Sequence, residues 1–253
     1  MTIKNNNFFC ATLSNAIIAR RAQARRSNLL WTLLFCCLFV PSLVFAETIH
    51  YTIHQLGFNG KASLTMAGPK EFKGYKTLLI VFRAKGTNYS DEEDIYVDPK
   101  TYKPLFVERD FNLNIFGQGK TLEDYVTTKG EIHITKKDGD RVTEQIINNV
   151  GAVDNIYGFI FRYRKEGTFK TGDHINMTLP TRNLEFKFIG HQPLKINGKY
   201  YDSLYMQSEP VRYKIWFDSS AHKWPLRITG SYGFINSVMT MTGYEEQIND
   251  ASR

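Results

Sequence analysis

The clearest strand pattern in this protein is Val211-Arg212-Tyr213-Lys214-Ile215-Trp216-Phe217-Asp218. Apolar side chains occupy its odd positions, and the even positions are polar apart from Trp216. A period of two residues puts the two sets on opposite faces of a β-strand. Residues 183–189 repeat the pattern with Leu184, Phe186 and Phe188. Both stretches indicate an antiparallel sheet with one face packed on a core.

Outward from these stretches, short runs rich in Ile, Val, Tyr, Phe and Thr recur about every ten residues between turn residues, which is typical of antiparallel β proteins. Asp138-Gly139 and Asn197-Gly198 supply the positive φ angles that tight hairpins need. The sequence predicts a mainly β protein: a single curved antiparallel sheet or partly open barrel. The further strands are expected at residues 50–56, 61–66, 77–85, 94–97, 104–116, 131–136, 141–147, 174–179, 195–196, 200–207, 226–229 and 234–244.

One segment has helical spacing instead. Val153, Ile156, Tyr157, Ile160 and Phe161 fall at i, i+3, i+4, i+7 and i+8, the apolar stripe of an amphipathic helix. We expect one short helix over residues 155–164, capped by Asp154, ended near Gly167 and lying across the concave face of the sheet.

The first 46 residues differ from the rest and predict a cleavable signal peptide. Four arginines (Arg20, Arg21, Arg25 and Arg26) precede an apolar run over residues 29–46, which is broken by Pro41 and ends in a small residue. We expect cleavage after Ala46, leaving residues 47–253 as a single domain in the bacterial periplasm. An uncleaved membrane anchor is the alternative. Cys36 and Cys37 lie inside the run and follow bulky Phe35, which disfavours a lipid anchor.

Without this segment, both the net charge and the cysteine content of the chain are different. The chain has 253 residues and a net charge of +7, but the segment carries five cationic residues and no acidic ones. The remainder has a net charge of about +2, so nothing favours nucleic-acid binding, which needs clustered cations. All three cysteines (Cys10, Cys36 and Cys37) lie in the segment as well. The mature domain must therefore be held together by its core.

Motifs that would carry catalysis or cofactor chemistry are weak. Residues 116–121 end in Gly-Lys-Thr, but Asn114 stands where a phosphate-binding loop has its first glycine, so a plain loop is expected. No Gly-x-Ser-x-Gly elbow for a nucleophilic serine occurs. A pair of catalytic carboxylates leaves no local signature, so a hydrolase stays open. We expect no cofactor, and non-enzymatic binding is favoured over catalysis.

Metal binding is also disfavoured by the spacing of the possible ligands. His50 and His54 share a strand face but lie about 13 Å apart on an extended chain. The acidic run at residues 91–94 lacks the alternation and the turn glycine of a calcium loop.

Aromatic content is the least ordinary feature, since about thirty Phe, Tyr and Trp remain after the signal. A curved sheet that closes imperfectly around such side chains can enclose an apolar cavity for a small ligand. Ordinary core packing is the alternative for each of them. The candidate wall residues are Phe159, Phe161, Tyr163, Trp216 and Trp224.

Several landmarks resemble an exported bacterial family, the domain of unknown function 3108. They are Asp154-Asn155-Ile156-Tyr157, Phe161-Arg162-Tyr163-Arg164, Gly172-Asp173, Gly198-Lys199-Tyr200, residues 214–218 and Trp224-Pro225-Leu226, together with the opening at residues 51–64 and Asp98-Pro99-Lys100-Thr101. The resemblance implies an exported, curved antiparallel sheet and assigns no catalytic residue.

Three functions remain open from the sequence. The first is a periplasmic protein that binds an apolar or amphipathic envelope component such as a lipid. The second is an assembly partner that adds an edge strand to another envelope protein. The third is a hydrolase of cell-wall polymers. No stable membrane span is expected once the signal is removed, and the protein partners are not defined by the sequence.

Overall fold

The computed structural model describes residues 44–249, apart from residues 56–57, 113–116, 149–150, 181 and 233–234. The expected signal peptide therefore lies outside the described residues except for its last three positions. The described residues form one compact unit, Val44–Asn249. Its strands are β1 (Val44–Gln55), β2 (Phe58–Phe72), β3 (Tyr75–Gly86), β4 (Ser90–Val97), β5 (Pro104–Asn112), β6 (Gln118–Val126), β7 (Glu131–Asp138), β8 (Arg141–Ile147), β9 (His174–Leu179), β10 (Arg182–Ile196), β11 (Lys199–Glu209), β12 (Tyr213–Asp218), β13 (Pro225–Tyr232) and β14 (Ile235–Asn249).

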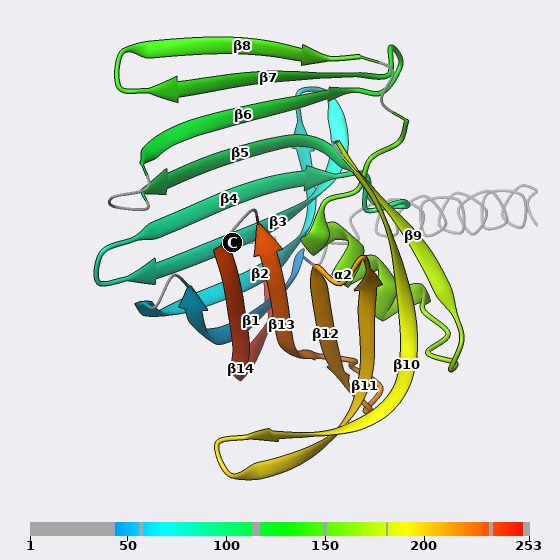
Figure 1. Ribbon diagram of the computed structural model, residues 1–253. Helices are drawn as coiled ribbons and strands as arrows, with labels where there is room; N and C mark the ends of the chain where they lie inside the picture. The colour runs from blue at the N-terminus through cyan, green and yellow to red at the C-terminus, as the bar shows by residue number, and fades with distance from the viewer. Residues whose placement is uncertain are drawn as a thin grey trace, which may run out of the picture. The chain divides into compact units, whose positions relative to one another are not determined.

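These strands make a single 14-stranded antiparallel sheet, as the strand patterns predict. β1 to β8 pair in sequence order, β9 to β14 do the same, and the two runs join where β1 pairs with β14 (Figure 1). The sheet is not closed, because β8 and β9 stand at opposite ends of the strand order. The segment that connects these two edges carries the helix α2 (Ile156–Glu166).

The helix lies on the concave side of the curved sheet and touches both of its halves. Tyr157 stacks on Phe82 of β3 with ring centroids 4.8 Å apart, and Phe159 stacks on Phe186 of β10 at 4.5 Å. Because two strands so distant in the sheet meet one helix, the sheet must wrap around it. The expectation of one short helix across the concave face is confirmed.

The cap of this helix differs from the expected one. Asn155, rather than Asp154, is the N-cap, and its Oδ1 accepts a hydrogen bond from the amide of Tyr157 at 2.9 Å. Asp154 is instead tied to β9, where its Oδ2 accepts from the amide of Thr178 at 3.0 Å. At the other end Gly167 is the C-cap, and its amide donates to the carbonyl of Tyr163.

Buried apolar side chains form one large cluster between α2 and the concave face and a smaller one outside it. The large cluster includes Ile49, Leu64, Ile95 and Phe217, each completely buried. The smaller cluster joins Leu194, Ile196 and Leu226 to the partly buried Tyr201, Trp216 and Met241. It packs the end of the β10–β11 hairpin against side chains of β12, β13 and β14.

Both expected tight hairpins are present, and one expected loop is wrong. Gly139 has φ +57° at the tip of β7–β8, and Asn197 and Gly198 have φ +48° and +82° at the tip of β10–β11. Residues 118–121, expected in a loop, instead begin strand β6. The strand has no apolar–polar alternation, because its inward-facing positions include the polar Thr121 and Glu123 beside Tyr125.

Candidate functional site

The helix α2 is held in the curved sheet by an ion pair that reaches the central strand. Arg164 Nη1 lies 2.6 Å from Glu47 Oε1 of β1, and its Nη2 lies 3.2 Å from Glu47 Oε2. The two side chains are only 10 % and 6 % exposed. The guanidinium also lies 4.4 Å from the centroid of the Trp224 ring and donates to the carbonyl of His222. Burial of two charges is tolerated here because each one has charged, aromatic or backbone partners.

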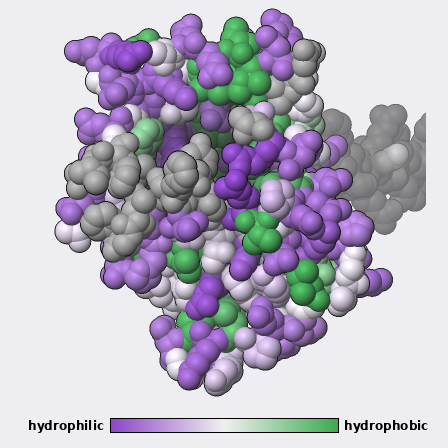
Figure 2. Space-filling model, viewed as in Figure 1, coloured by the Kyte–Doolittle hydropathy of each residue, from purple (hydrophilic) through white to green (hydrophobic). Residues whose placement is uncertain are grey.

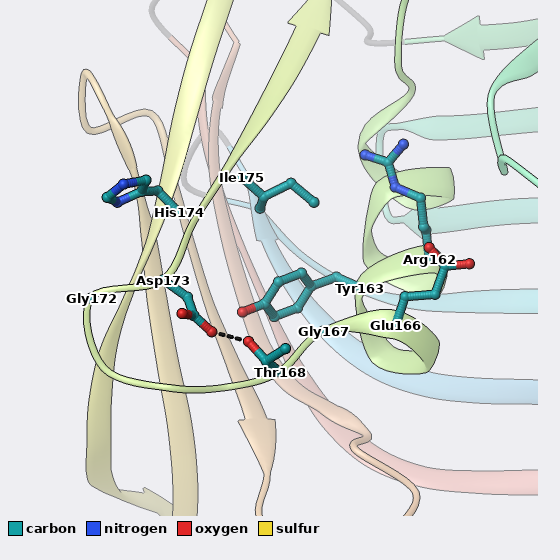
Figure 3. A pocket seen from close by; sticks show the side chains of 9 residues that line it. All are labelled: Arg162, Tyr163, Glu166, Gly167, Thr168, Gly172, Asp173, His174 and Ile175. Carbon is teal, nitrogen blue, oxygen red and sulfur yellow. Dashed lines mark hydrogen bonds between the residues drawn. The ribbon is translucent and has the colours of Figure 1, made fainter.

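A cavity of about 510 Å³ opens between the end of α2 and the edge strand β9. Its size falls in the range of small-molecule sites, about 300–1,000 Å³. It is lined by Arg162, Tyr163, Glu166, Gly167, Thr168, Gly172, Asp173, His174 and Ile175 (Figure 3). The lining therefore comes from the helix, from the loop after it and from the first two residues of β9.

The loop after the helix is closed by its own hydrogen bonds. Thr168 Oγ1 donates to Asp173 Oδ2, and the amide of Lys170 donates to the same oxygen at 3.2 Å (Figure 3). The amide of Phe188 on β10 donates to the carbonyl of Asp173 at 2.9 Å. The loop is thereby fixed against the sheet, and one wall of the cavity is formed before any ligand enters.

Figure 3 shows two chemically different sides to this cavity. The ring of Tyr163 and the side chain of Ile175 provide apolar surface, and the Tyr163 hydroxyl points toward Asp173. Burial and the Asp173 carboxylate raise the pKa of Tyr163 to about 12, although its hydrogen bond with the Phe169 backbone opposes the shift. The hydroxyl stays protonated at neutral pH.

Arg162 is the cationic group of the cavity. Its Nη1 lies 3.2 Å from Asp154 Oδ1, and its side chain is 14 % exposed. The Nε atom is buried and has no hydrogen-bond partner among the described residues. A buried donor without a partner is costly, so an acceptor brought by a ligand would stabilise this position.

A second polar group lies on the concave face of β4 to β6. Arg109 makes a two-point ion pair with the buried Asp91, at 2.7 and 2.6 Å. Glu93 stands opposite Arg109 in the strand register and accepts a hydrogen bond from the cap residue Asn155. Desolvation raises the pKa of Glu93 to about 7. The positive charge of Arg109 opposes this shift, and the negative charge of Asp91 adds to it.

The structure brings four of the five candidate wall residues to the concave side but does not group them around a cavity. Phe159, Phe161 and Trp224 are buried in the large core cluster, and only Tyr163 lines the cavity. Trp216 lies on the opposite face, where it stacks on Tyr205 at 4.8 Å and donates to Gln192. Alternation along β12 explains the difference, since its neighbours Ile215 and Phe217 point inward.

Sequence reasoning missed the polar lining of the cavity. Arg162, Glu166 and Asp173 match no catalytic or ligand-binding motif in the sequence. Their shared position follows from the tight loop that returns the chain from α2 to β9. Two landmarks were available as signals: Phe161-Arg162-Tyr163-Arg164 at the end of the helix, and Gly172-Asp173 at the turn between the helix and a strand.

The described residues contain neither a metal-binding cluster nor a helix that could span a membrane. No group of three or more His, Cys, Asp or Glu side chains in this part of the chain could hold a metal ion. Nor does any helix among the described residues have the length and apolar character needed to cross a membrane.

Comparison with known proteins assigns no family and no function to this chain. No known protein family matches the chain, and no curated protein matches it. One similar solved structure is a beta-barrel-like protein of domain of unknown function DUF1849 from Brucella abortus, with 8% identity and a TM-score of 0.46. The alignment covers 82% of this chain and 98% of that chain. The resemblance to domain of unknown function 3108 stays a prediction.

Proposed function

We propose that the protein is exported to the periplasm and binds an amphipathic envelope component, such as a lipid, in the cavity between α2 and β9. The proposal is supported by the cavity of about 510 Å³, which has an apolar side and a polar, charged side. Export is supported by the order of positive, apolar and small residues in the first 46 positions.

The two sides of the cavity match the two parts of an amphipathic molecule. Ile175 and the Tyr163 ring offer surface to a hydrocarbon portion, while the guanidinium of Arg162 offers donors to an acidic or ester oxygen. Arginine is well suited to such a group because it stays charged and presents several donors in one plane. An amphipathic molecule with an acceptor oxygen in its head group and at least one acyl chain is therefore the expected ligand class.

The experiment is displacement of a fluorescent fatty acid from purified residues 47–253, compared with Ile175→Trp and Asn176→Trp. Ile175 lines the cavity, whereas Asn176 is exposed and points to the other face of the edge strand β9. We expect Ile175→Trp to fill the cavity and weaken binding at least about tenfold. Asn176→Trp should bind like the parent protein. Equal binding by all three proteins, or no binding by any, contradicts the proposal.

A second function, strand addition to an envelope protein, is favoured by the edge strand β8. Val142 and Ile146 on this strand are each 55 % exposed, and Figure 2 shows apolar surface beside β7 and β8. A free strand edge with apolar side chains is a template for pairing. Val142→Lys together with Ile146→Lys should abolish chemical crosslinks in a periplasmic extract, and Tyr200→Lys should leave them unchanged. Crosslinks that persist in the double variant count against this role.

A further inference from the structure

The end of the β10–β11 hairpin extends past the strands that flank it. β9 pairs with β10 only along residues 182–187, and β12 pairs with β11 only along residues 203–207. Residues 193–202 therefore pair with each other across the hairpin and with no third strand. This end of the hairpin is the lowest part of the sheet in Figure 1.

The two faces of this hairpin end are different. Leu194 and Ile196 point to one face, where they are buried in the smaller core cluster and hold the hairpin against the rest of the protein. Lys195 and Tyr200 stand opposite each other in the strand register and, by alternation, occupy the other face. Tyr200 is 69% exposed, the highest value among the large apolar side chains of the described residues. The second face is therefore open to solvent.

Three cations lie at this hairpin end. Lys195 Nζ lies 5.3 Å from the centroid of the Tyr200 ring, and Lys199 Nζ lies 5.0 Å from that of the Tyr201 ring. Arg227 Nη2 of β13 lies 3.5 Å from the carbonyl oxygen of Lys195. Within the described part of the chain, none of the three makes an ion pair with a carboxylate. Their partners are aromatic rings and backbone, so their charge is not neutralised.

No acidic side chain of the hairpin end offsets these cations. Residues 192–201 contain no Asp or Glu, and Asp202 at their border lies 3.0 Å from Nδ1 of His191. Tyrosine favours the head-group level of a membrane, where its ring is in apolar surroundings and its hydroxyl in polar ones. Lysine and arginine are attracted to the negative charge of acidic lipids. The hairpin end combines both properties on one exposed face.

We propose that the end of the β10–β11 hairpin docks the protein onto a lipid surface that carries negative charge. In the docked state the Tyr200 ring lies among the head groups, and Lys195 and Lys199 lie beside lipid phosphates. The attraction falls off within a Debye length, so docking is reversible and weakened by salt. The hairpin end shares no residue with the lining of the cavity between α2 and β9. The inference therefore goes beyond the proposed ligand binding and does not depend on it.

The test is flotation of purified residues 47–253 with vesicles of phosphatidylcholine that contain phosphatidylglycerol, and with vesicles of phosphatidylcholine alone. Lys195→Glu together with Lys199→Glu reverses both lysine charges of the hairpin end. The matched control is Lys136→Glu together with Lys137→Glu, which makes the same change in net charge near the tight turn of the β7–β8 hairpin. All four lysines are exposed, and circular dichroism checks that both double variants keep the fold.

We expect the parent protein to bind the vesicles with phosphatidylglycerol at least about tenfold more tightly than those without it, and high salt to remove the difference. The hairpin double variant should lose at least about tenfold in binding, and the control double variant at most about twofold. Tyr200→Ser should weaken binding about threefold, whereas Tyr75→Ser, at another exposed tyrosine, should not.

Three results would each overturn the inference. They are no vesicle binding by the parent protein, equal binding to both kinds of vesicle, and equal losses in the two double variants. The outcome is separate from that of the fatty-acid experiment, because Ile175→Trp leaves the hairpin unchanged and should bind vesicles like the parent protein.

Discussion

Glu93 Oε1 accepts a hydrogen bond from Asn155 Nδ2 at 2.9 Å, so strand β4 is joined directly to the residue that caps helix α2. The same Asn155 accepts from the amide of Tyr157 through its other side-chain atom. One amide side chain thus connects the start of the helix to the sheet. Because the helix carries three residues of the cavity, this link helps to place the cavity as well.

The first prediction concerns the pH dependence of this link. The pKa of Glu93 is raised from 4.5 to about 7, so the folded state binds more protons than the unfolded state between these values. The free energy of unfolding therefore falls as pH rises through this range, and the full loss of stability is reached above pH 7. Glu93→Gln should raise the free energy of unfolding at pH 8 by about 1–3 kcal/mol and flatten the profile.

Urea denaturation at several pH values measures this effect. Glu108→Gln on β5 is the control, since Glu108 is exposed and alternates to the other face from Arg109. Its pH profile should follow the parent protein. An unchanged slope in Glu93→Gln would show that the Glu93 carboxylate is ionised at its usual pKa in the folded protein.

The second prediction concerns the buried ion pair. Arg164→Met leaves the Glu47 carboxylate buried without its partner, and we expect a loss of about 3–5 kcal/mol in the free energy of unfolding. The double variant Glu47→Gln with Arg164→Met should recover part of that loss. For comparison, Lys120 and Asp110 form a pair that is 58% and 53% exposed, and Lys120→Met should cost at most about 1 kcal/mol. Similar losses at both pairs would contradict this assignment.

The third prediction concerns Gly158, where α2 approaches the turn before β5. A Cβ at this position would collide with the carbonyl oxygen of Tyr102. Alanine normally stabilises a helix relative to glycine by about 1 kcal/mol, but Gly158→Ala should instead destabilise the protein by about 1–3 kcal/mol. Gly151→Ala, which has open space around it, is the control and should be close to neutral. Greater thermal stability of Gly158→Ala would mean that the helix does not pack this closely.

The fourth prediction distinguishes the two tryptophans of residues 47–253, Trp216 and Trp224. Trp224 is 3% exposed and stacks between Tyr244 and Arg164, whereas Trp216 is only partly buried on the convex side. Acrylamide should quench the fluorescence of the Trp224→Phe variant, which retains Trp216, more strongly than that of Trp216→Phe. Stronger quenching of Trp216→Phe, which retains Trp224, would contradict the burial of Trp224 in the core.

Period-two alternation predicted most strands and the open, mainly β fold because inward positions such as Ile215 and Phe217 are apolar. It failed at β6, where Thr121 and Glu123 face inward toward neighbours on β5 and β7. Residue type alone could not separate Trp216 from Trp224, because the face that a side chain occupies depends on strand register. Local sequence patterns could not predict the cavity, because its charged lining is brought together by the loop between the helix and strand β9.

The most direct measurement of the central claim is native mass spectrometry of the protein purified from a periplasmic extract without denaturation. We expect a chain that begins at Glu47 and carries one additional mass of several hundred daltons, which the Ile175→Trp variant loses and the Asn176→Trp variant keeps. A chain that carries no additional mass, or one whose additional mass is unaffected by Ile175→Trp, would contradict ligand binding in the cavity between α2 and β9.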